Sequence, residues 1–243
     1  MGLDLGGRVA LVTGGSRGIG AAVAVALADA GAAVAVNYRE RADDANKVVA
    51  AITAKGGRAM AVAADVSQSA SVTKMVEQIA KDIGRIDILV NNAGIAIVRG
   101  LDELTEDDFD RTITVNLKSA FLCTQAVVPA MRARKWGRIV NITSGAARGA
   151  GAIGPHYNAS KAGMEGLTCG YAARLVKEGI TVNSVAPSLI ETDMMRGRTD
   201  LARNIPLGRM GQASEVAQAV TMVLGNDYMT GQTIVLNGGM SFI

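Results

Sequence analysis

The sequence predicts a doubly wound α/β fold, in which helices cover both faces of a parallel sheet. Short apolar segments with the length of strands alternate with longer segments of helical character along the whole chain. The short segments are apolar at every position rather than at alternate ones, which is typical of strands buried on both faces. Right-handed crossovers between such strands place helices on both sides of the sheet and a ligand crevice at the strands' carboxyl ends.

The expected elements follow one another in a regular order. Strands are expected at residues 9–13, 33–36, 58–63, 86–90, 138–142, 181–186 and 233–236. Helices are expected at 19–30, 41–55, 71–83, from about 117 to 135, around Tyr157 and Lys161, and at 214–224. Gly31 ends the first helix, and Thr105 followed by acidic residues is typical of a helix start. No repeat or linker interrupts the order, so residues 1–243 are expected to form one domain.

Composition and charge exclude several classes of function. The net charge of +3 is slight, and no run of Lys and Arg indicates a nucleic-acid surface. The chain starts with a strand, without a signal peptide, and no apolar run is long enough for a bilayer, so we expect a cytoplasmic protein without membrane contact. Cys123 and Cys169 lie in apolar helical patterns and are expected to be buried reduced thiols. No metal site is expected, since His156 is the single histidine and has no cluster of partner ligands.

A glycine-rich turn joins the first strand to the first helix at residues 13–20, Thr-Gly-Gly-Ser-Arg-Gly-Ile-Gly. Glycines there let the backbone approach a pyrophosphate, which the free N–H groups and the dipole of the helix stabilise. Such a turn can also serve close packing alone, but its place between a buried strand and a helix favours nucleotide binding. The turn therefore predicts a Rossmann-type dinucleotide site.

The end of the second strand bears on the choice between NAD and NADP. NAD-dependent enzymes usually place Asp or Glu there to bind the ribose hydroxyls. This chain has Asn37, Tyr38 and Arg39 instead, and Arg17 protrudes from the glycine turn. The two arginines could hold a 2′-phosphate from two sides, which favours NADP (NADPH). The alternative is two solvated arginines, and the neighbouring Glu40 keeps NAD open.

Tyr157 and Lys161 stand one helical turn apart on the same face of a predicted helix. An ammonium held beside a phenol favours the phenolate and brings its pKa toward the working range of a general acid or base. Such a pair suits the reduction of a carbonyl or the oxidation of an alcohol. By itself it is also common on solvated helix faces, so the interpretation depends on the rest of the chain.

Together these features resemble the short-chain dehydrogenase/reductase family over essentially the whole chain. Asp65 and Val66 are similar to the family's adenine-contacting site, and residues 91–94 (Asn-Asn-Ala-Gly) to the motif that supports its central sheet. The family's four catalytic positions are occupied by Asn116, Ser144, Tyr157 and Lys161. The resemblance implies cofactor contacts from Gly14, Ser16, Arg17, Gly18, Ile19, Gly20, Asn37, Arg39, Asp65, Val66, Asn92, Ala93, Gly94, Tyr157, Lys161, Pro187, Ile190 and Thr192.

The resemblance also implies a role for each catalytic residue. Tyr157 would exchange a proton with the substrate oxygen, which Ser144 would polarise. Lys161 would lower the pKa of Tyr157 and hold the nicotinamide ribose, and Asn116 would carry a water that links Lys161 to solvent. Thr192 would fix the nicotinamide carboxamide. From the residues alone, Ser144 could instead be a turn residue and Asn116 a helix cap.

Within the family, the resemblance is closest to the 3-oxoacyl-acyl-carrier-protein reductases of fatty-acid biosynthesis, notably at residues 190–194 and 228–240. It implies NADPH-dependent reduction of a ketone to a secondary alcohol, a substrate carried on acyl carrier protein, and a homotetramer. Basic positions beside the active-site mouth would attract the acidic carrier. Those positions are Arg132, Arg134, Lys135 and Arg174.

Two departures from the family pattern concern the substrate. Ser188 follows Pro187 where the family usually has glycine, and the lid at residues 192–206 is short. The expected pocket lining is apolar and suits methylenes: Ala93, Gly94, Ile95, Ala146, Ala147, Ile153, Leu189 and Met194. The alternatives are a dehydrogenase for another small ketone, alcohol or sugar, and a non-catalytic NADP-binding scaffold.

Overall fold

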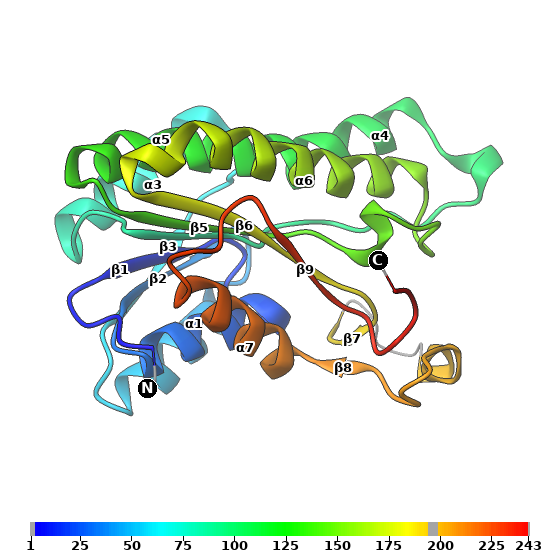
Figure 1. Ribbon diagram of the computed structural model, residues 1–243, viewed down its shortest axis with the longest axis horizontal. Coiled ribbons are helices and arrows are strands. Elements are labelled where there is room, and N and C mark those ends of the chain that lie inside the picture. The colour runs from blue at the N-terminus through cyan, green and yellow to red at the C-terminus, as the bar shows by residue number, and fades with distance from the viewer. Residues whose placement is uncertain (1–2, 194–198, 243) are drawn as a thin grey trace.

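The computed structural model describes residues 3–193 and 199–242. Within them, seven strands form a parallel sheet in the order β3-β2-β1-β4-β5-β6-β9 (Figure 1). They are β1 (Val9–Val12), β2 (Ala33–Tyr38), β3 (Ala59–Ala63), β4 (Ile88–Asn91), β5 (Gly137–Ile142), β6 (Ile180–Pro187) and β9 (Thr233–Leu236). The strand order reverses between β1 and β4, which places the ligand crevice of a doubly wound sheet at their carboxyl ends.

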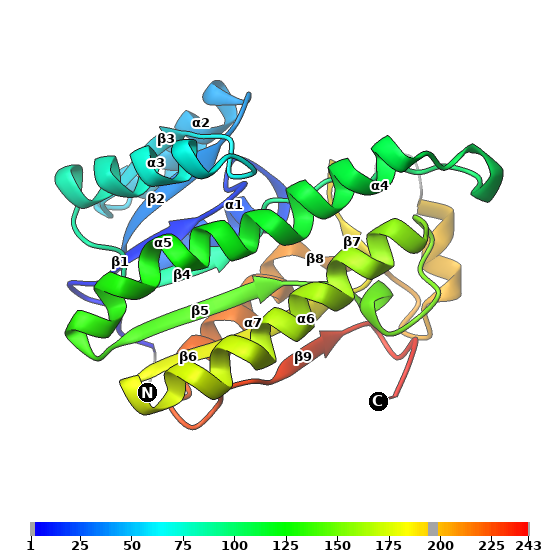
Figure 2. The same cartoon turned by 90° about the horizontal axis from the view of Figure 1, so that it is seen from above.

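Helices cover both faces of this sheet, as Figures 1 and 2 show. One layer holds α1 (Gly18–Asp29), α2 (Ala42–Thr53) and α7 (Ala213–Leu224). The other holds α3 (Ser69–Asp82), α5 (Ser119–Arg134), α6 (Pro155–Leu175) and the short α4 (Glu106–Thr112). The predicted doubly wound α/β fold is therefore confirmed.

Successive residues of the strands face opposite helix layers. Ala10 and Val12 pack in the core with α1 and α7, whereas Val9 and Leu11 pack in the core with α3 and α5. All four are buried. This is why the strands appear in the sequence as unbroken apolar runs rather than as alternating patterns.

The helix expected from about residue 117 begins earlier in the structure. α4, a π-helical segment (Ile113–Lys118) and α5 follow one another without a break. The predicted cap at Thr105 is confirmed, since its Oγ1 accepts from the N–H of Asp108 at 3.1 Å. Residues 112–115, Thr-Ile-Thr-Val, are β-branched and have low helix propensity, so the sequence pattern did not join the two helices.

Two smaller expectations also differ from the structure. Cys123 is buried as expected, but Cys169 is exposed on α6. The surrounding residues of α6 are small and weakly polar, so the sequence did not distinguish its buried face from its exposed one. The short strands β7 (Ile190–Glu191) and β8 (Gly211–Gln212) pair in parallel as a second sheet. Strands of two residues are too short to give a periodic signal.

Candidate active site

Ser144, Tyr157 and Lys161 meet at the carboxyl edge of the sheet. β5 ends at Ile142, so Ser144 lies just beyond it. α6 begins at Pro155, a residue favoured in the first turn of a helix because its missing N–H needs no partner there. Tyr157 and Lys161 both lie buried near the start of α6. The structure therefore brings these three predicted residues together.

Ser144 contacts the phenol of Tyr157 and also caps a short 3₁₀ turn (Gly145–Ala147). Its Oγ accepts from the N–H of Ala146 at 3.2 Å, and its side chain also interacts with the phenol of Tyr157. Burial raises the pKa of Tyr157, and the hydrogen bond from Ser144 opposes that rise. The two hydroxyl groups converge where a carbonyl oxygen could accept hydrogen bonds from both.

Lys161 is buried behind the ring of Tyr157. Its Nζ lies 5.8 Å from the ring centroid, donates to the carbonyl oxygen of Ile142 at 2.8 Å and contacts Sδ of Met164 at 3.7 Å. Burial lowers the pKa of Lys161 to about 8. The Nζ of Lys161 is directed at the Ile142 carbonyl rather than at the phenol. Burial is the larger influence on the phenol, so the pKa of Tyr157 is raised here and not lowered as expected.

Asn116 lies within the π-helical segment and is not a helix cap. Its buried amide accepts from the N–H of Ile95 at 2.8 Å and donates to the Ile95 carbonyl and to Ser160 Oγ, each at 3.1 Å. A Cβ on Gly94 would lie 3.2 Å from Asn116 Oδ1 and 3.7 Å from Lys161 Nζ. Asn116 therefore fixes the backbone beside Lys161, in a π turn of the kind often found at functional sites. Its role as a water carrier stays a prediction.

The glycine turn after β1 forms a cradle that has no room for side chains. Gly14 and Gly18 have φ angles of 60° and 54°, which favour glycine. A Cβ on Gly20 would collide with the carbonyl oxygen of Gly14 and lie 2.5 Å from Asn92 Nδ2. The side chain of Arg17, at the N-cap, makes no capping bond, so the first N–H groups of α1 remain for an anion. These residues fit the pyrophosphate of a dinucleotide.

Two asparagines brace this turn. Asn37 is 2% exposed; its Oδ1 accepts from Gly14 N–H at 3.2 Å, and its Nδ2 donates to the carbonyls of Val62 and Ala64 at 3.3 and 3.1 Å. Asn92 Nδ2 donates to the Gly14 carbonyl at 3.0 Å. The Asn37 side chain is thus occupied by backbone groups and holds Gly14 in place. A direct contact with the cofactor stays a prediction.

The other predicted cofactor residues surround the crevice. Arg17 pairs with Asp193 at 3.5 Å and Arg39 with Glu40 at 2.6 Å, and both arginine side chains are about half exposed. The methyl group of Thr192 would lie 3.4 Å from a Cβ on Gly18, so the segment after β6 approaches the glycine turn. The remaining residues lie at or just beyond strand ends. Ser16 and Ile19 follow β1, Asp65 and Val66 follow β3, and Ala93 follows β4. Pro187 ends β6, and Ile190 begins β7.

Comparison with known proteins agrees with this geometry. A sequence model of the short chain dehydrogenase family matches residues 8–202. The chain belongs to the short-chain dehydrogenase family. It is 43% identical over 238 residues to a 3-oxoacyl-[acyl-carrier-protein] reductase of Synechocystis, covering 96% of each chain. Its identity to the BbsD subunit of (2S)-[(R)-hydroxy(phenyl)methyl]succinyl-CoA dehydrogenase from Thauera aromatica is 42%, again over 96% of each chain.

A solved structure extends the comparison to the fold. A gluconate 5-dehydrogenase from Burkholderia cenocepacia, in complex with NADP and tartrate, superposes with a TM-score of 0.90 at 36% identity. The match covers 98% of this chain and 96% of that one. As a short-chain dehydrogenase, the protein is an oxidoreductase that interconverts a ketone and an alcohol, and enzymes of this kind use NAD(H) or NADP(H).

Sequence reasoning gave His156 no firm role, and the structure places it inside the site. It is 1% exposed, directly precedes Tyr157 on α6, and its Nε2 lies 3.0 Å from the carbonyl oxygen of Ile97. That contact ties the loop after β4 to the start of the catalytic helix. His156 lies within α6, which begins at Pro155.

The predicted pocket residues lie on loops at the carboxyl edge. Ala146, Ala147, Ile153 and Leu189 are half-buried on the segments that follow β5 and β6. Ala93 and Ile95 are half-buried after β4, where Gly94 is exposed. Met194 lies outside the described residues.

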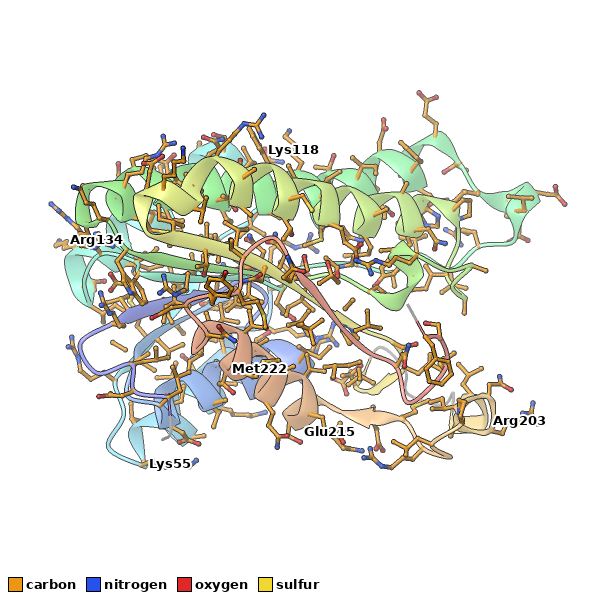
Figure 3. All side chains as sticks on the ribbon, in the orientation of Figure 1. Lys55, Lys118, Arg134, Arg203, Glu215 and Met222 are labelled. Carbon is orange, nitrogen blue, oxygen red and sulfur yellow. The ribbon has the colours of Figure 1, made fainter. Side chains whose placement is uncertain are left out.

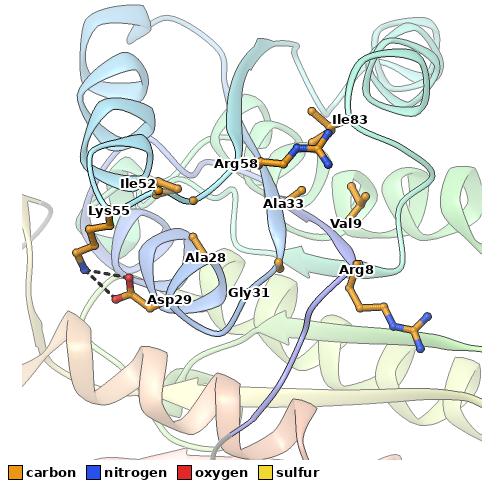
Figure 4. Close-up of a pocket in the computed structure, with 14 residues that line it drawn as sticks. Arg8, Val9, Ala28, Asp29, Gly31, Ala33, Ile52, Lys55, Arg58 and Ile83 are labelled. Atoms are coloured by element: carbon orange, nitrogen blue, oxygen red, sulfur yellow. Dashed lines mark hydrogen bonds and ion pairs between the residues drawn. The ribbon is translucent and has the colours of Figure 1, made fainter.

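A cavity of 440 Å³ lies at the opposite edge of the sheet, near the amino ends of β1, β2 and β3 (Figure 4). Lys55 and Asp29 form an ion pair of 2.9 Å at its rim. α1 and α2 end here, and cations are favoured at helix C-termini, which accounts for Lys55 and Arg58.

Among the described residues, no group of His, Cys, Asp and Glu could hold a metal ion. In the same ranges, every helix is too short or too polar to span a bilayer.

The basic positions expected beside the active-site mouth lie elsewhere. Arg132 and Arg134 are in the last turn of α5, and Arg174 is in the last turn of α6, whereas Tyr157 is in the first. At ~1.5 Å per residue, Arg174 lies about 25 Å along the helix from Tyr157. Figure 3 shows Arg134 at the far end of the molecule from β7 and β8. Within one chain the expectation is therefore wrong, because both helices run away from the mouth.

Proposed function

We propose that this enzyme uses NADPH to reduce the ketone of a 3-oxoacyl thioester, carried on acyl carrier protein, to the 3-hydroxyacyl product of fatty-acid synthesis. The observation that carries the proposal is the convergence of the Ser144 and Tyr157 hydroxyls beside buried Lys161. The name of the Synechocystis relative supports the substrate. We further infer that residues 1–243 form one dinucleotide-binding catalytic domain that acts in the cytoplasm.

The chemistry follows from the placement of the hydroxyls. A bound nicotinamide would supply a hydride to the carbonyl carbon. Ser144 and Tyr157 donate hydrogen bonds to the carbonyl oxygen, and Tyr157 gives it a proton as negative charge develops there. A neutral phenol is the form that donates, and burial favours that form. Lys161, with a pKa of about 8, can return a proton to the site near neutral pH.

The preference for NADPH rests on the charges around the glycine turn. Arg17 and Arg39 each keep about half of their side chain exposed, within reach of a phosphate beside the adenosine ribose. A hollow of 300 Å³ next to Arg17 also carries Lys47, and within it Lys47 pairs with Asp44 at 3.4 Å and Arg17 with Asp193 at 3.5 Å. Glu40 is paired with Arg39 at 2.6 Å, so a 2′-phosphate would bind Arg39 in place of this carboxylate.

One interface of the proposed homotetramer finds support in the charge pattern of the long helices. Residues 101–110 are rich in exposed acids near the mouth: Asp102, Glu103, Glu106, Asp107 and Asp110. The far ends of α5 and α6 are basic. Antiparallel pairing of α5 and α6 with those of a second copy would join opposite charges. It would also bring the partner's basic helix ends to this chain's mouth, where an acidic carrier protein would dock.

Size and salt dependence test the assembly together with the docking. Light scattering should give a tetramer at micromolar concentration, and a monomer would contradict the proposal. With acetoacetyl-acyl carrier protein, KM should rise steeply with salt, because screening weakens contacts between exposed charges. With free acetoacetyl esters, KM should change little. Equal salt dependence for both substrates would reject docking through these charges.

A second function has one specific observation in its favour. The acidic residues around the mouth would repel an acidic carrier protein if the enzyme acted as a single copy. A small ketone, alcohol or sugar that needs no carrier would then be the substrate. Efficient turnover of such a compound without turnover of acetoacetyl thioesters would establish this alternative. A non-catalytic scaffold would turn over neither.

A further inference from the structure

The residue after β6 lies beside the loop that carries Ser144. β5 and β6 are neighbours, and their register continued beyond the strand ends sets Gly145 opposite Ser188. A Cβ on Gly145 would lie 3.6 Å from Cβ of Ser188 and 3.7 Å from its Oγ. The N–H of Ser188 donates to the carbonyl of Leu236 at 2.8 Å, which fixes this residue to the end of β9. The Ser188 side chain therefore stands next to Gly145, the residue that follows Ser144 in the loop after β5.

Ser188 in turn holds a side chain from the C-terminal turn. Its Oγ donates to Sδ of Met240 at 3.3 Å. The turn is fixed by two further bonds: Met240 N–H to the Asn237 carbonyl at 3.2 Å, and Asn237 Nδ2 to the Ser241 carbonyl at 2.8 Å. Met240 thus has a defined place beside the site, although 43% of its surface is exposed.

The same turn is joined to the segment that follows the lid. The N–H of Leu207 donates to the carbonyl of Gly238 at 3.0 Å. A Cβ on Gly239 would lie 3.3 Å from Pro206. The loop after β5, the residue after β6, the C-terminal turn and residues 206–207 consequently form one wall at the carboxyl edge of the sheet.

We propose that Ser188 and Met240 set the chain-length preference of the enzyme. Met240 contacts the carbon chain of the substrate beyond its ketone, and Ser188 holds the thioether in place. The inference depends on one part of the proposed function, the reduction of a ketone. It does not depend on a substrate carried by acyl carrier protein. A methionine side chain is apolar and adaptable, which suits alkyl chains of different length. The glycine usual after Pro187 in this family would leave Met240 without a hydrogen-bond partner.

The pair also discriminates against polyhydroxylated substrates. The Ser188 hydroxyl is directed at the sulfur of Met240, and a thioether is a weak acceptor. A sugar hydroxyl against this wall would find an acceptor in the Ser188 oxygen and a weak one in the thioether, but the Ser188 hydrogen is already bonded to sulfur, so the sugar's bonds to water would be only partly replaced. The wall therefore fits an alkyl ketone better than a sugar.

The test uses two free 3-oxo esters, ethyl acetoacetate and ethyl 3-oxooctanoate, neither of which needs a carrier protein. Met240→Ala should lower kcat/KM for the longer ester relative to the shorter one by about tenfold, through loss of apolar contact. Met240→Leu keeps the volume and should restore most of that ratio. The Kd for NADPH and the thermal midpoint should stay at the wild-type values in both variants, which separates a pocket contact from a general disturbance.

Ser188→Ala removes only the hydroxyl and tests the link between the two residues. It should change the ratio of kcat/KM for the longer ester to kcat/KM for the shorter ester when Met240 is present. In Met240→Leu, where no sulfur accepts the bond, Ser188→Ala should leave this ratio unchanged. An unchanged ratio in well-folded Met240→Ala would overturn the inference, as would a wild-type enzyme that reduces neither ester. If both esters are reduced but acetoacetyl-acyl carrier protein is not, the carrier-protein proposal fails and the ratio still decides the role of Met240.

Discussion

Replacing Asn37 by aspartate separates two roles for the residue at the end of β2. An acid at the end of this strand is the usual mark of NAD-dependent enzymes, so a simple reading predicts a gain in NADH binding. In this structure Asn37 is buried, and its Nδ2 donates to the carbonyls of Tyr38, Val62 and Ala64 at 3.1–3.3 Å. Asn37→Asp would place a carboxylate oxygen against three carbonyl oxygens. We therefore expect loss of stability rather than a switch of cofactor.

The magnitude follows from the lost bonds. Each hydrogen bond is worth about 1 kcal/mol, and each buried group left without a partner costs about 1–3 kcal/mol. The loss in free energy of unfolding should therefore be about 3–5 kcal/mol at pH 7, a large part of the total for a typical domain. Desolvation raises the folded-state pKa of such an aspartate above its unfolded value. The variant should accordingly regain stability as the pH falls toward 5 and lose it as the pH rises.

Urea unfolding at pH 7 and pH 5 measures this effect, and fluorescence titration measures cofactor binding. Asn37→Ala is the matched control, because it removes the same donors without adding a charge. It should be destabilised less than Asn37→Asp at pH 7, and its stability should depend less on pH. An Asn37→Asp enzyme as stable as the wild type that binds NADH more tightly than NADPH would refute the reasoning.

Three further predictions concern other buried and charged groups. Arg17→Ala and Arg39→Ala should each weaken NADPH binding more than NADH binding, and a wild-type preference for NADH in the same titration would contradict the assignment. Lys161→Met should abolish turnover yet raise the free energy of unfolding by about 2 kcal/mol at pH 7, because burial lowers the pKa of Lys161 to about 8. This gain in free energy of unfolding should shrink as the pH rises from 8 toward 10.5, where the lysine of the unfolded chain also loses its proton. A gain that does not depend on pH would exclude the lowered pKa of Lys161 as its cause. His156→Phe should lower kcat with little change in the Kd for NADPH, and His156→Gln, which can still donate to the Ile97 carbonyl, should recover part of the loss.

The sequence predicted the sheet well because its strands are buried on both faces. Residues such as Val9 and Leu11 then appear as unbroken apolar runs with a strong signal. The start of the helix before Asn116 was missed, because β-branched residues weaken the helical pattern where the π turn occurs. The candidate catalytic residues were placed by resemblance to the family, because the one-turn spacing of Tyr157 and Lys161 is by itself common on solvated helix faces.

Other parts of the site depend on contacts that a sequence does not encode locally. Asn37 is at a strand end, and only the structure shows that its amide turns inward to Gly14. Arg134 was expected at the mouth from resemblance, yet it pairs with Asp87 at 3.1 Å at the opposite edge. The contact between Ser188 and Met240 joins residues 52 positions apart, so no local pattern could have indicated it.

The central claim is that Tyr157 gives its phenolic proton to the substrate oxygen. Tyr157→Phe keeps the buried ring and removes only the hydroxyl that contacts Ser144. Single-turnover reduction of acetoacetyl-acyl carrier protein with saturating NADPH measures the chemical step directly. The rate should fall by about 100- to 10,000-fold, while the Kd for NADPH and the thermal midpoint stay near the wild-type values. A Tyr157→Phe enzyme that reduces the ketone at the wild-type rate would contradict the account.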